Sequence, residues 1–366
     1  MKFSINRDTL LPPLQQIVSV IEKKQTMPIL SNVLMVIDAD TLTMTGTDLE
    51  IQILARLAVI GAKPGAITLP ARKFLDICRL LPPNTEIRIE QHGDMVKLAT
   101  SRSRFSLSCL PAENYPDFAV SQMENSFQIS ASKLKKGLDK TMFCMANQDV
   151  RYYLNGLLLH ISNTALKLVA SDGHRLAIYE DELESPTGLE ARIIVPRKGV
   201  MELSRMLDDS DAQLQVSFSS NHIKVEVHNT VFSAKLVDSK YPDFGKVFQQ
   251  AFLPPLSIQK PFLREALTRV AILANEKFRG VTFRFTADQL HINAHNPEHE
   301  EAEEELSINY NGDDFSISFN AQYMLDAVSN LDADTAELTI ASNLSSCFIT
   351  EPEQQAYKFI VMPMKL

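Results

Sequence analysis

The pentapeptide Ser171-Asp172-Gly173-His174-Arg175 brings together a hydroxyl, a carboxylate and an imidazole, the side chains of a hydrolytic site. Similar apolar blocks elsewhere in the sequence are followed by Thr47-Asp48 and by His295-Asn296, which lack that combination. Asp, Asn, Ser and Thr side chains commonly close turns by bonding to the backbone. The recurrence with altered residues therefore favours a repeated turn over a catalytic site.

Three histidines, His291, His295 and His299, are spaced four apart, which would place metal ligands on one face of a helix. Apolar and polar residues alternate around them, which is the pattern of a strand, so a metal site is the less favoured alternative. The chain also lacks Gly-x-Gly, a P-loop and a Gly-x-Ser-x-Gly elbow. We therefore predict no catalytic centre, metal or cofactor.

The net charge of −9 argues against a nucleic-acid partner only if the charge is evenly distributed. Six segments with helical patterns together carry +10, so the remaining residues carry −19. Glu forms helices as well as Lys and Arg but is rare in these segments. We predict a basic surface that attracts phosphates without reading bases; the alternative is an ordinary solvated helix face. The segments are 5–24, 71–82, 130–146, 196–207, 260–280 and 320–331.

The chain repeats itself three times. The block that starts at Leu42 returns at Leu166 and again at Leu290, at a constant offset of 124 residues. Tyr115-Pro-Asp-Phe118 returns unchanged as Tyr241-Pro-Asp-Phe244. Ordered blocks at nearly one period indicate tandem domains of about 122 residues each. We place the domains at 1–124, 125–250 and 251–366, with linkers near 121–126 and 249–255.

Each repeat combines two helices with several strands. Leu10, Leu14 and Ile17 follow helical spacing, whereas 87–90 and 223–227 alternate as half-buried strands do. Two helices per repeat over antiparallel sheets is an α+β architecture. Each repeat thus consists of two similar halves, each with one helix and its strands. Six such halves in one chain suggest an arc or a ring.

Composition sets the expected cellular setting. No apolar run of about 18 residues could span a membrane, and Met1–Asn6 does not resemble a secretion leader. The four cysteines are scattered and form no Cys-x-x-Cys pair. We expect a cytoplasmic protein with reduced, partly buried thiols.

The segment Glu298–Glu305 is the densest run of acidic residues. One interpretation is structural: the run is a solvated loop or an edge strand protected by its charge. The other is that it binds the basic segment Ser101–Phe105. Opposite charges at the two ends of a chain permit a head-to-tail contact between subunits, which can close into a ring. The apolar C-terminus, Phe359–Leu366, is predicted to begin as the last core strand and to end beside an exposed apolar cleft.

Several motifs together resemble the bacterial DNA polymerase III beta subunit family, the sliding clamps, over the whole chain. They are Gly46–Glu50, Pro70–Phe74, Ser101–Leu107, Gln148–Gly156, Asp172–Leu176, Val195–Gly199, Asn275–Gly280 and Val361–Met364. The resemblance implies a ring-shaped homodimer with three DNA-clamp repeats per subunit, helices lining a pore and antiparallel sheets outside. It also implies a non-catalytic processivity subunit of the polymerase holoenzyme.

The resemblance further implies three sets of functional residues. Contacts to duplex DNA are assigned to Lys24, Arg72, Gln148, Tyr152 and Tyr153. A cleft for short peptides of polymerases and repair proteins is assigned to Leu154, Ser171, Gly173, His174, Arg175, Leu176, Pro242, Lys246, Val247, Leu344, Ile360, Met362, Pro363 and Met364. The dimer contact is assigned to Lys73, Arg102, Arg104, Phe105 and Leu107 against Ile272, Leu273, Glu298, Glu300, Glu301, Glu303 and Glu304.

The same resemblance implies a separate clamp-loader ATPase, because the chain has no ATP motif. Two other classes stay open on the residues alone: a conventional DNA-groove binder and an enzyme. A groove binder would bind short linear duplexes with a steep salt dependence, and an enzyme would transfer nucleotides by itself.

Overall fold

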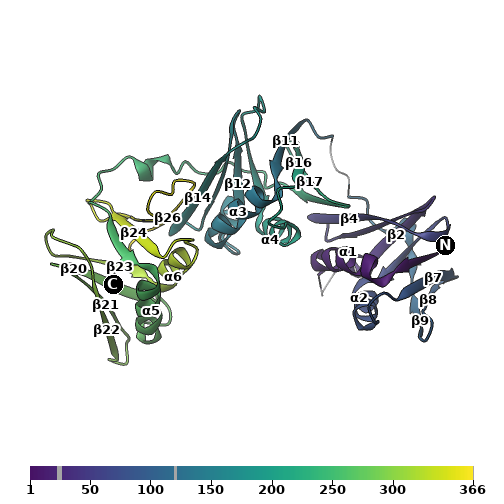
Figure 1. Cartoon of the computed structure of the whole chain (residues 1–366), viewed down its shortest axis with the longest axis horizontal. Helices are drawn as coiled ribbons and strands as arrows, with labels where there is room; N and C mark the ends of the chain where they lie inside the picture. Colours follow the sequence, from purple (N-terminus) through teal and green to yellow (C-terminus); the bar gives the residue numbers. More distant parts are fainter. Residues whose placement is uncertain (23–26, 119–121, 366) are drawn as a thin grey trace. The chain divides into compact units, whose positions relative to one another are not determined.

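The computed structural model describes residues 1–22, 27–118 and 122–365. By its contacts the chain divides into two compact units. One unit comprises Met1–Lys135 and Lys198–Val237, and the other comprises Lys136–Arg197 and Asp238–Leu366. The middle third of the chain therefore contributes to both units (Figure 1).

The first third of the chain sets the order of elements: a strand, a helix, three strands, a further strand, a second helix and three more strands. Its main elements are β1 (Lys2–Asn6), α1 (Arg7–Val20), β2 (Asn32–Asp38), β3 (Thr41–Thr47), β4 (Ile51–Ala58), β6 (Gly65–Pro70), α2 (Ala71–Leu80), β7 (Glu86–His92), β8 (Met95–Ala99) and β9 (Arg104–Ser108). Two short strands, β5 (Ile60–Lys63) and β10 (Leu110–Pro111), are additions to this order.

The same order recurs in the other two thirds, as the repeat analysis predicts. The second repeat has β11 (Asn125–Ser130), α3 (Ala131–Thr141), β12 (Gly156–Ile161), β13 (Ala165–Ser171), β14 (Arg175–Glu182), β15 (Ala191–Pro196), α4 (Arg197–Met206), β16 (Gln213–Phe218), β17 (His222–Val227) and β18 (Thr230–Lys235). The third has β19 (Leu256–Gln259), α5 (Lys260–Val270), β20 (Gly280–Thr286), β21 (Gln289–His295), β22 (Glu301–Ser307), β23 (Phe315–Asn320), α6 (Ala321–Ser329), β24 (Thr335–Ile340), β25 (Cys347–Thr350) and β26 (Tyr357–Val361).

The strands of the described residues form four antiparallel sheets, which confirms the predicted α+β architecture. The first unit has a nine-stranded sheet, β10-β6-β2-β3-β4-β18-β17-β16-β11, and a five-stranded sheet, β5-β1-β7-β8-β9. The second unit has an eight-stranded sheet, β15-β12-β13-β14-β26-β25-β24-β19, and a four-stranded sheet, β22-β21-β20-β23.

Two of these sheets run across the boundary between repeats. The first and second repeats meet where β4 pairs with β18, with Ile53 opposite Phe232. The second and third meet where β14 pairs with β26, with Ala177 opposite Phe359. All four side chains are buried, so both joints are continuous sheet with a continuous apolar core.

Each of the six predicted helical segments contains one α-helix. Helix α1 begins after Asn6, whose side chain accepts a hydrogen bond from the Asp8 amide, and it buries Leu10, Leu14 and Ile17. The predicted strands at 87–90, 223–227 and the start of the C-terminal segment are also confirmed. Among the helices of the described residues, none is both long and apolar enough to cross a membrane.

Candidate functional site: an apolar cleft beside a recurrent turn

The turn at 171–175 is held by hydrogen bonds from its own side chains. The Ser171 hydroxyl donates to the Arg175 carbonyl at 2.7 Å and accepts from the Gly173 amide at 3.0 Å. The Asp172 carboxylate accepts from the amides of His174 and Arg175 at 2.9 and 3.0 Å. The hydroxyl and the carboxylate are therefore engaged with the backbone.

The same turn occurs in the first repeat, which confirms the prediction of a recurrent structural element. Thr47 donates to the Ile51 carbonyl at 2.7 Å. Asp48 accepts from the amides of Glu50 and Ile51 at 2.9 and 2.7 Å. In the third repeat, Asn296 accepts from the Glu300 amide at 3.0 Å. A side chain that closes a turn explains why this position is Asp or Asn in all three copies.

Gly173 lies in the left-handed region, with φ of +88°. A Cβ atom there would lie 2.9 Å from a guanidinium nitrogen of Arg151, so only glycine fits without displacing that side chain. Arg151 also donates to the Asp172 carbonyl at 3.1 Å and pairs with Asp149 at 2.8 Å. The side-chain hydrogen bond from Arg151, with its backbone hydrogen bond, lowers the pKa of Asp149 to about 2.

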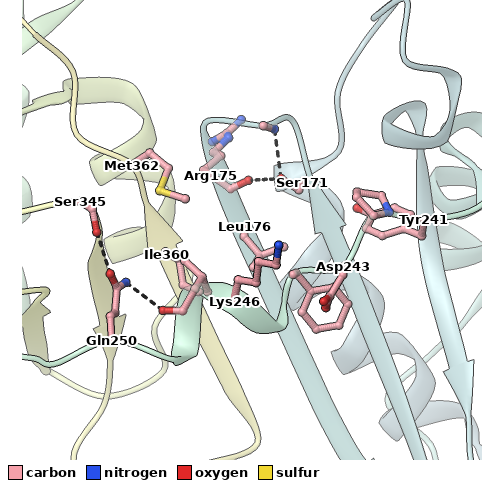
Figure 2. A pocket seen from close by; sticks show the side chains of 14 residues that line it. Ser171, Arg175, Leu176, Tyr241, Asp243, Lys246, Gln250, Ser345, Ile360 and Met362 are labelled. Carbon is pink, nitrogen blue, oxygen red and sulfur yellow. Dashed lines mark hydrogen bonds between the residues drawn. The ribbon is translucent and has the colours of Figure 1, made fainter.

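A cleft of about 430 Å³ opens beside this turn, within the second unit (Figure 2). Its walls come from the turn and β14, from the segment 241–250, from Ser345, and from β26 with the residue that follows it. The walls are mainly apolar, and they carry the cationic side chains of Arg175 and Lys246. The lining residues are Ser171, Gly173, Arg175, Leu176, Tyr241, Pro242, Asp243, Phe244, Lys246, Val247, Gln250, Ser345, Ile360 and Met362.

Nine residues assigned to a cleft from the sequence line this cavity together: Ser171, Gly173, Arg175, Leu176, Pro242, Lys246, Val247, Ile360 and Met362. Five others do not line it: Leu154, His174, Leu344, Pro363 and Met364. Leu154 is buried, and the His174 ring instead stacks on Tyr323, with centroids 6.3 Å apart. The Met364 amide donates to the Ser318 carbonyl at 2.8 Å.

Sequence reasoning missed five lining residues: Tyr241, Asp243, Phe244, Gln250 and Ser345. Three of them belong to the Tyr-Pro-Asp-Phe motif, and the recurrence of this motif in the sequence could have identified them. Gln250 and Ser345 had no such signal, and they meet through a 2.7 Å hydrogen bond (Figure 2). Burial is the main cause that raises the pKa of Tyr241, which keeps this phenol neutral.

Arg175 is held from two sides. Its guanidinium pairs with Asp172 at 3.0 Å and with Asp326 of α6 at 2.5 Å. It also lies over the Tyr323 ring, 4.4 Å from the ring centre. A planar cation fixed in this way presents a rigid wall to the cleft.

The residues assigned to DNA contact lie in several places. Arg72 is exposed on α2 in the first unit and donates to the Ile21 carbonyl at 2.8 Å. In the second unit, Gln148 has φ of +58°, and the Tyr152 side chain is 75% exposed. Tyr153 is half-buried against Tyr241, with ring centroids 6.5 Å apart. Lys24 lies outside the described residues.

Some of the basic helix residues are engaged within the protein. Lys198 of α4 forms ion pairs with Asp48 and Glu22. Lys140 of α3 is buried and donates to the Asn330 carbonyl and to Asp332. The excess of positive charge on the helices therefore serves the joints between repeats as well as any surface.

Six of the twelve residues assigned to a dimer contact lie on two sheet edges. Arg104, Phe105 and Leu107 belong to β9, the edge of the five-stranded sheet, and Arg102 precedes it. Glu301, Glu303 and Glu304 belong to β22, the edge of the four-stranded sheet. The remaining members are Lys73 on α2, Ile272 and Leu273 after α5, and Glu298 and Glu300 before β22.

The acidic run Glu298–Glu305 thus forms part of an edge strand, β22, which is one of the two interpretations of its sequence. Glu304 is also held within the chain, because Arg269 of α5 donates to it at 2.6 Å. This side-chain hydrogen bond is the main cause that lowers the pKa of Glu304.

The strand predicted around the histidines is confirmed as β21. His291 and His295 lie on this strand, and the His299 amide donates to the Asn296 carbonyl in the following turn. Within the described part of the chain, the three imidazoles do not meet in one metal-ligand cluster. All four cysteines are free thiols, three of them buried, as expected.

Family models of the DNA polymerase III beta subunit match the chain in three consecutive parts. The N-terminal domain matches residues 1–119, the central domain 128–243 and the C-terminal domain 246–365. The beta sliding clamps of Pseudomonas aeruginosa and Escherichia coli K12 are 41% and 42% identical, with complete coverage of both chains.

Solved structures agree with the sequence relatives. A Pseudomonas aeruginosa sliding clamp bound to griselimycin superposes with a TM-score of 0.94 at 40% identity over all of both chains. The Caulobacter crescentus polymerase III beta subunit gives 0.93 at 30% identity, also over all of both chains. The chain therefore belongs to the DNA polymerase III beta subunit family, the beta sliding clamps.

Proposed function

We propose that the chain acts as a sliding clamp: two copies close head to tail around duplex DNA and tether a replicative polymerase to it. As a member of the beta subunit family, the chain is a non-catalytic processivity factor. The observation that carries the ring is the presence of two complementary free sheet edges, β9 and β22.

The two joints within the chain support a second copy of the chain as the partner of these edges. β18 and β26 close the second and third repeats, and they pair with β4 and β14 of the preceding repeats. β9 is the counterpart of β18 and β26, and β22 is the counterpart of β4 and β14. Neither β9 nor β22 has a second partner strand among the described residues. A second copy of the chain would supply one to each edge.

The internal joints also predict the register of this contact. β22 pairs with β21 as β14 pairs with β13, so Glu301 is the counterpart of Leu176. Leu176 lies opposite Ile360, and the counterpart of Ile360 in the first repeat is Ser106. Ser106 of one copy should therefore lie opposite Glu301 of the other.

This register pairs compatible side chains on both faces of the new sheet. It sets Arg104 opposite Glu303, which are both exposed on their strands. It sets Phe105 opposite Ala302, which are both half-buried. Cross-strand pairs of opposite charge and apolar pairs each stabilise a sheet, so the contact is favourable in both layers.

The segment after α5 gives a second contact for the same interface. At the joint of the second and third repeats, Phe143 packs against Phe359 with ring centroids 5.2 Å apart. Ile272 is the counterpart of Phe143, and its side chain is 75% exposed. Phe105 is the counterpart of Phe359. Ile272 should therefore pack against Phe105 of the second copy, next to Leu107 and Leu273.

The DNA contacts we propose are weak and independent of sequence. A closed ring cannot leave a long duplex, so it needs only loose, water-bridged phosphate contacts that allow sliding. Arg72, Gln148, Tyr152, Tyr153 and Lys24 are proposed for this role, together with exposed basic residues of the helices. A separate ATPase would open and load the ring.

The cleft is the proposed site for partner peptides. Its apolar walls and its two cations, Arg175 and Lys246, suit a short segment with apolar side chains and an acidic group. The replicative polymerase, other polymerases, repair proteins and the clamp loader would share it.

We also propose domain limits at 1–124, 125–250 and 251–366. The proposed location is the cytoplasm, a reducing compartment to which the four free thiols are suited.

Binding to a short linear duplex tests this proposal against a groove-binding protein. A groove binder loses affinity with a slope of about −0.9 in log–log salt dependence for each phosphate it neutralises. We expect the clamp to bind such a duplex weakly, and tight, salt-steep binding would support the rival instead. The isolated chain should show no nucleotide transfer, whereas measurable transfer would support the enzyme.

A further inference from the structure

A cluster of three metal-ligating side chains lies on the four-stranded sheet, apart from the cleft. His291 of β21 lies directly opposite Glu305 of β22, and Glu303 is on the same face of β22, two residues away. The His291 Nδ1 atom is 3.4 Å from Glu303 Oε1 and 3.5 Å from Glu305 Oε1. One ligand atom from each side chain lies within 4.8 Å of the others.

These distances match the edges of a metal coordination tetrahedron. Zinc binds imidazole nitrogen and carboxylate oxygen at about 2.0–2.2 Å, so two tetrahedral ligands lie about 3.3–3.5 Å apart. The two nitrogen–oxygen distances already have this value. The side chains of two exposed glutamates can rotate to close the third edge, and water would complete the sphere. No backbone movement is required.

The charges around His291 also favour a bound cation. Arg284 of β20 lies directly opposite His291 on the other side, and it lies 3.8 Å from Asp314. Asp314 offsets the charge of Arg284, so the two carboxylates of Glu303 and Glu305 leave an excess of negative charge beside the imidazole. Glu303 and Glu305 therefore attract a cation to the position beside the His291 ring nitrogen. A mixed imidazole and carboxylate set suits a divalent transition metal better than Mg²⁺ or Ca²⁺.

We propose that His291, Glu303 and Glu305 bind a divalent transition-metal ion such as Zn²⁺, and that this metal competes with pairing of β22 to a second copy. The competition rests on the proposed head-to-tail contact, in which Arg104 lies opposite Glu303 and Arg102 lies next to Glu305. A metal ion takes the carboxylate charge that these arginines would neutralise. The metal-bound edge therefore attracts the basic edge of the partner less strongly.

A calorimetric titration of the full chain with zinc chloride tests the site. We expect one zinc site per chain, retained in His295→Asn, whose histidine lies on the same strand but outside the cluster. Loss of an outer-sphere partner already costs about 10- to 100-fold in metal affinity, so His291→Asn should weaken binding at least about tenfold. Equal zinc affinity in the wild type and in His291→Asn would overturn the site.

Sedimentation velocity with and without saturating zinc tests the competition. The dimer dissociation constant should rise at least about tenfold with zinc in the wild type, return on addition of a chelator, and stay unchanged in His291→Asn. A zinc-bound wild type with an unchanged dissociation constant would overturn the competition. A chain that is monomeric without zinc would instead contradict the proposed ring, while the calorimetric result would still decide the metal site.

Discussion

The guanidinium of Arg175 donates a 2.5 Å hydrogen bond to the carboxylate of Asp326, which ties a strand of the second repeat to a helix of the third. Arg175 also lines the cleft, so two repeats together fix the position of a cleft residue. The corresponding turn in the first repeat is tied to the second by the ion pair of Asp48 with Lys198. The recurrent turn is therefore a fastening point between repeats at both internal joints.

Replacing Asp326 with Asn should loosen this fastening. Hydrogen bonds to charged groups contribute about 1.5–3 kcal/mol, and we expect the free energy of unfolding to fall by the lower part of that range because Asp326 is partly exposed. Peptide affinity for the cleft should fall as well, since Arg175 loses one anchor. Chemical denaturation and peptide titration measure the two effects. Asp334→Asn, which removes an exposed carboxylate from the same repeat, should change neither.

Removal of residues 362–366 should abolish peptide binding and leave the dimer intact. Met362 lines the cleft, and the strand β26 ends one residue before it. The tail is held by hydrogen bonds from the amides of Met362 and Met364, so its loss costs only about 1–3 kcal/mol of stability. Loss of dimerisation in the truncated chain would show that the tail belongs to the structural core. Met362→Ala should reproduce the binding defect alone.

Reversal of charge on the basic edge should break the dimer. Arg104→Glu places a carboxylate opposite Glu303 in the register derived from the internal joints, and like charges directly opposite destabilise a sheet. Solution mass should therefore report monomers, more completely when Arg102→Glu is added. The exchange Arg104→Glu with Glu303→Arg should restore the dimer. Lys63→Glu, on the opposite edge of the same sheet, serves as the matched control. Failure of the exchange to restore the dimer would reject this register.

The adjacent tyrosines should separate DNA contact from folding. Tyr152→Ala removes an exposed side chain, so we expect stability to change by less than about 0.5 kcal/mol while duplex binding weakens. Tyr153→Ala removes the ring that packs on Tyr241 and should lower the free energy of unfolding. Measuring both quantities for both variants checks the assignment. A Tyr152→Ala chain that binds DNA normally would exclude this tyrosine from the contact.

Features that depend on short sequence separation could be predicted well. The helices follow from stripes such as Leu10, Leu14 and Ile17, and the turn follows from the recurrence of Asp48 and Asp172. Local periodicity and local hydrogen bonding determine both, so the sequence shows them directly.

Features that depend on strand pairing could not be predicted in the same way. That Gln250 meets Ser345 in the cleft depends on the course of two loops 95 residues apart. The register of β21 with β22 places His291 opposite Glu305, and it places His295 opposite Glu301 instead. Which strands lie at sheet edges also follows only from the complete pairing order.

Retention on DNA of different topology tests the clamp most directly. In this test a clamp-loader ATPase is used to load the proposed ring onto nicked circular DNA, and the DNA is then cut once or left intact. We predict that the protein stays on the circle through gel filtration and escapes after linearisation, because only topology holds it there. Equal retention on circular and linear DNA would contradict encirclement.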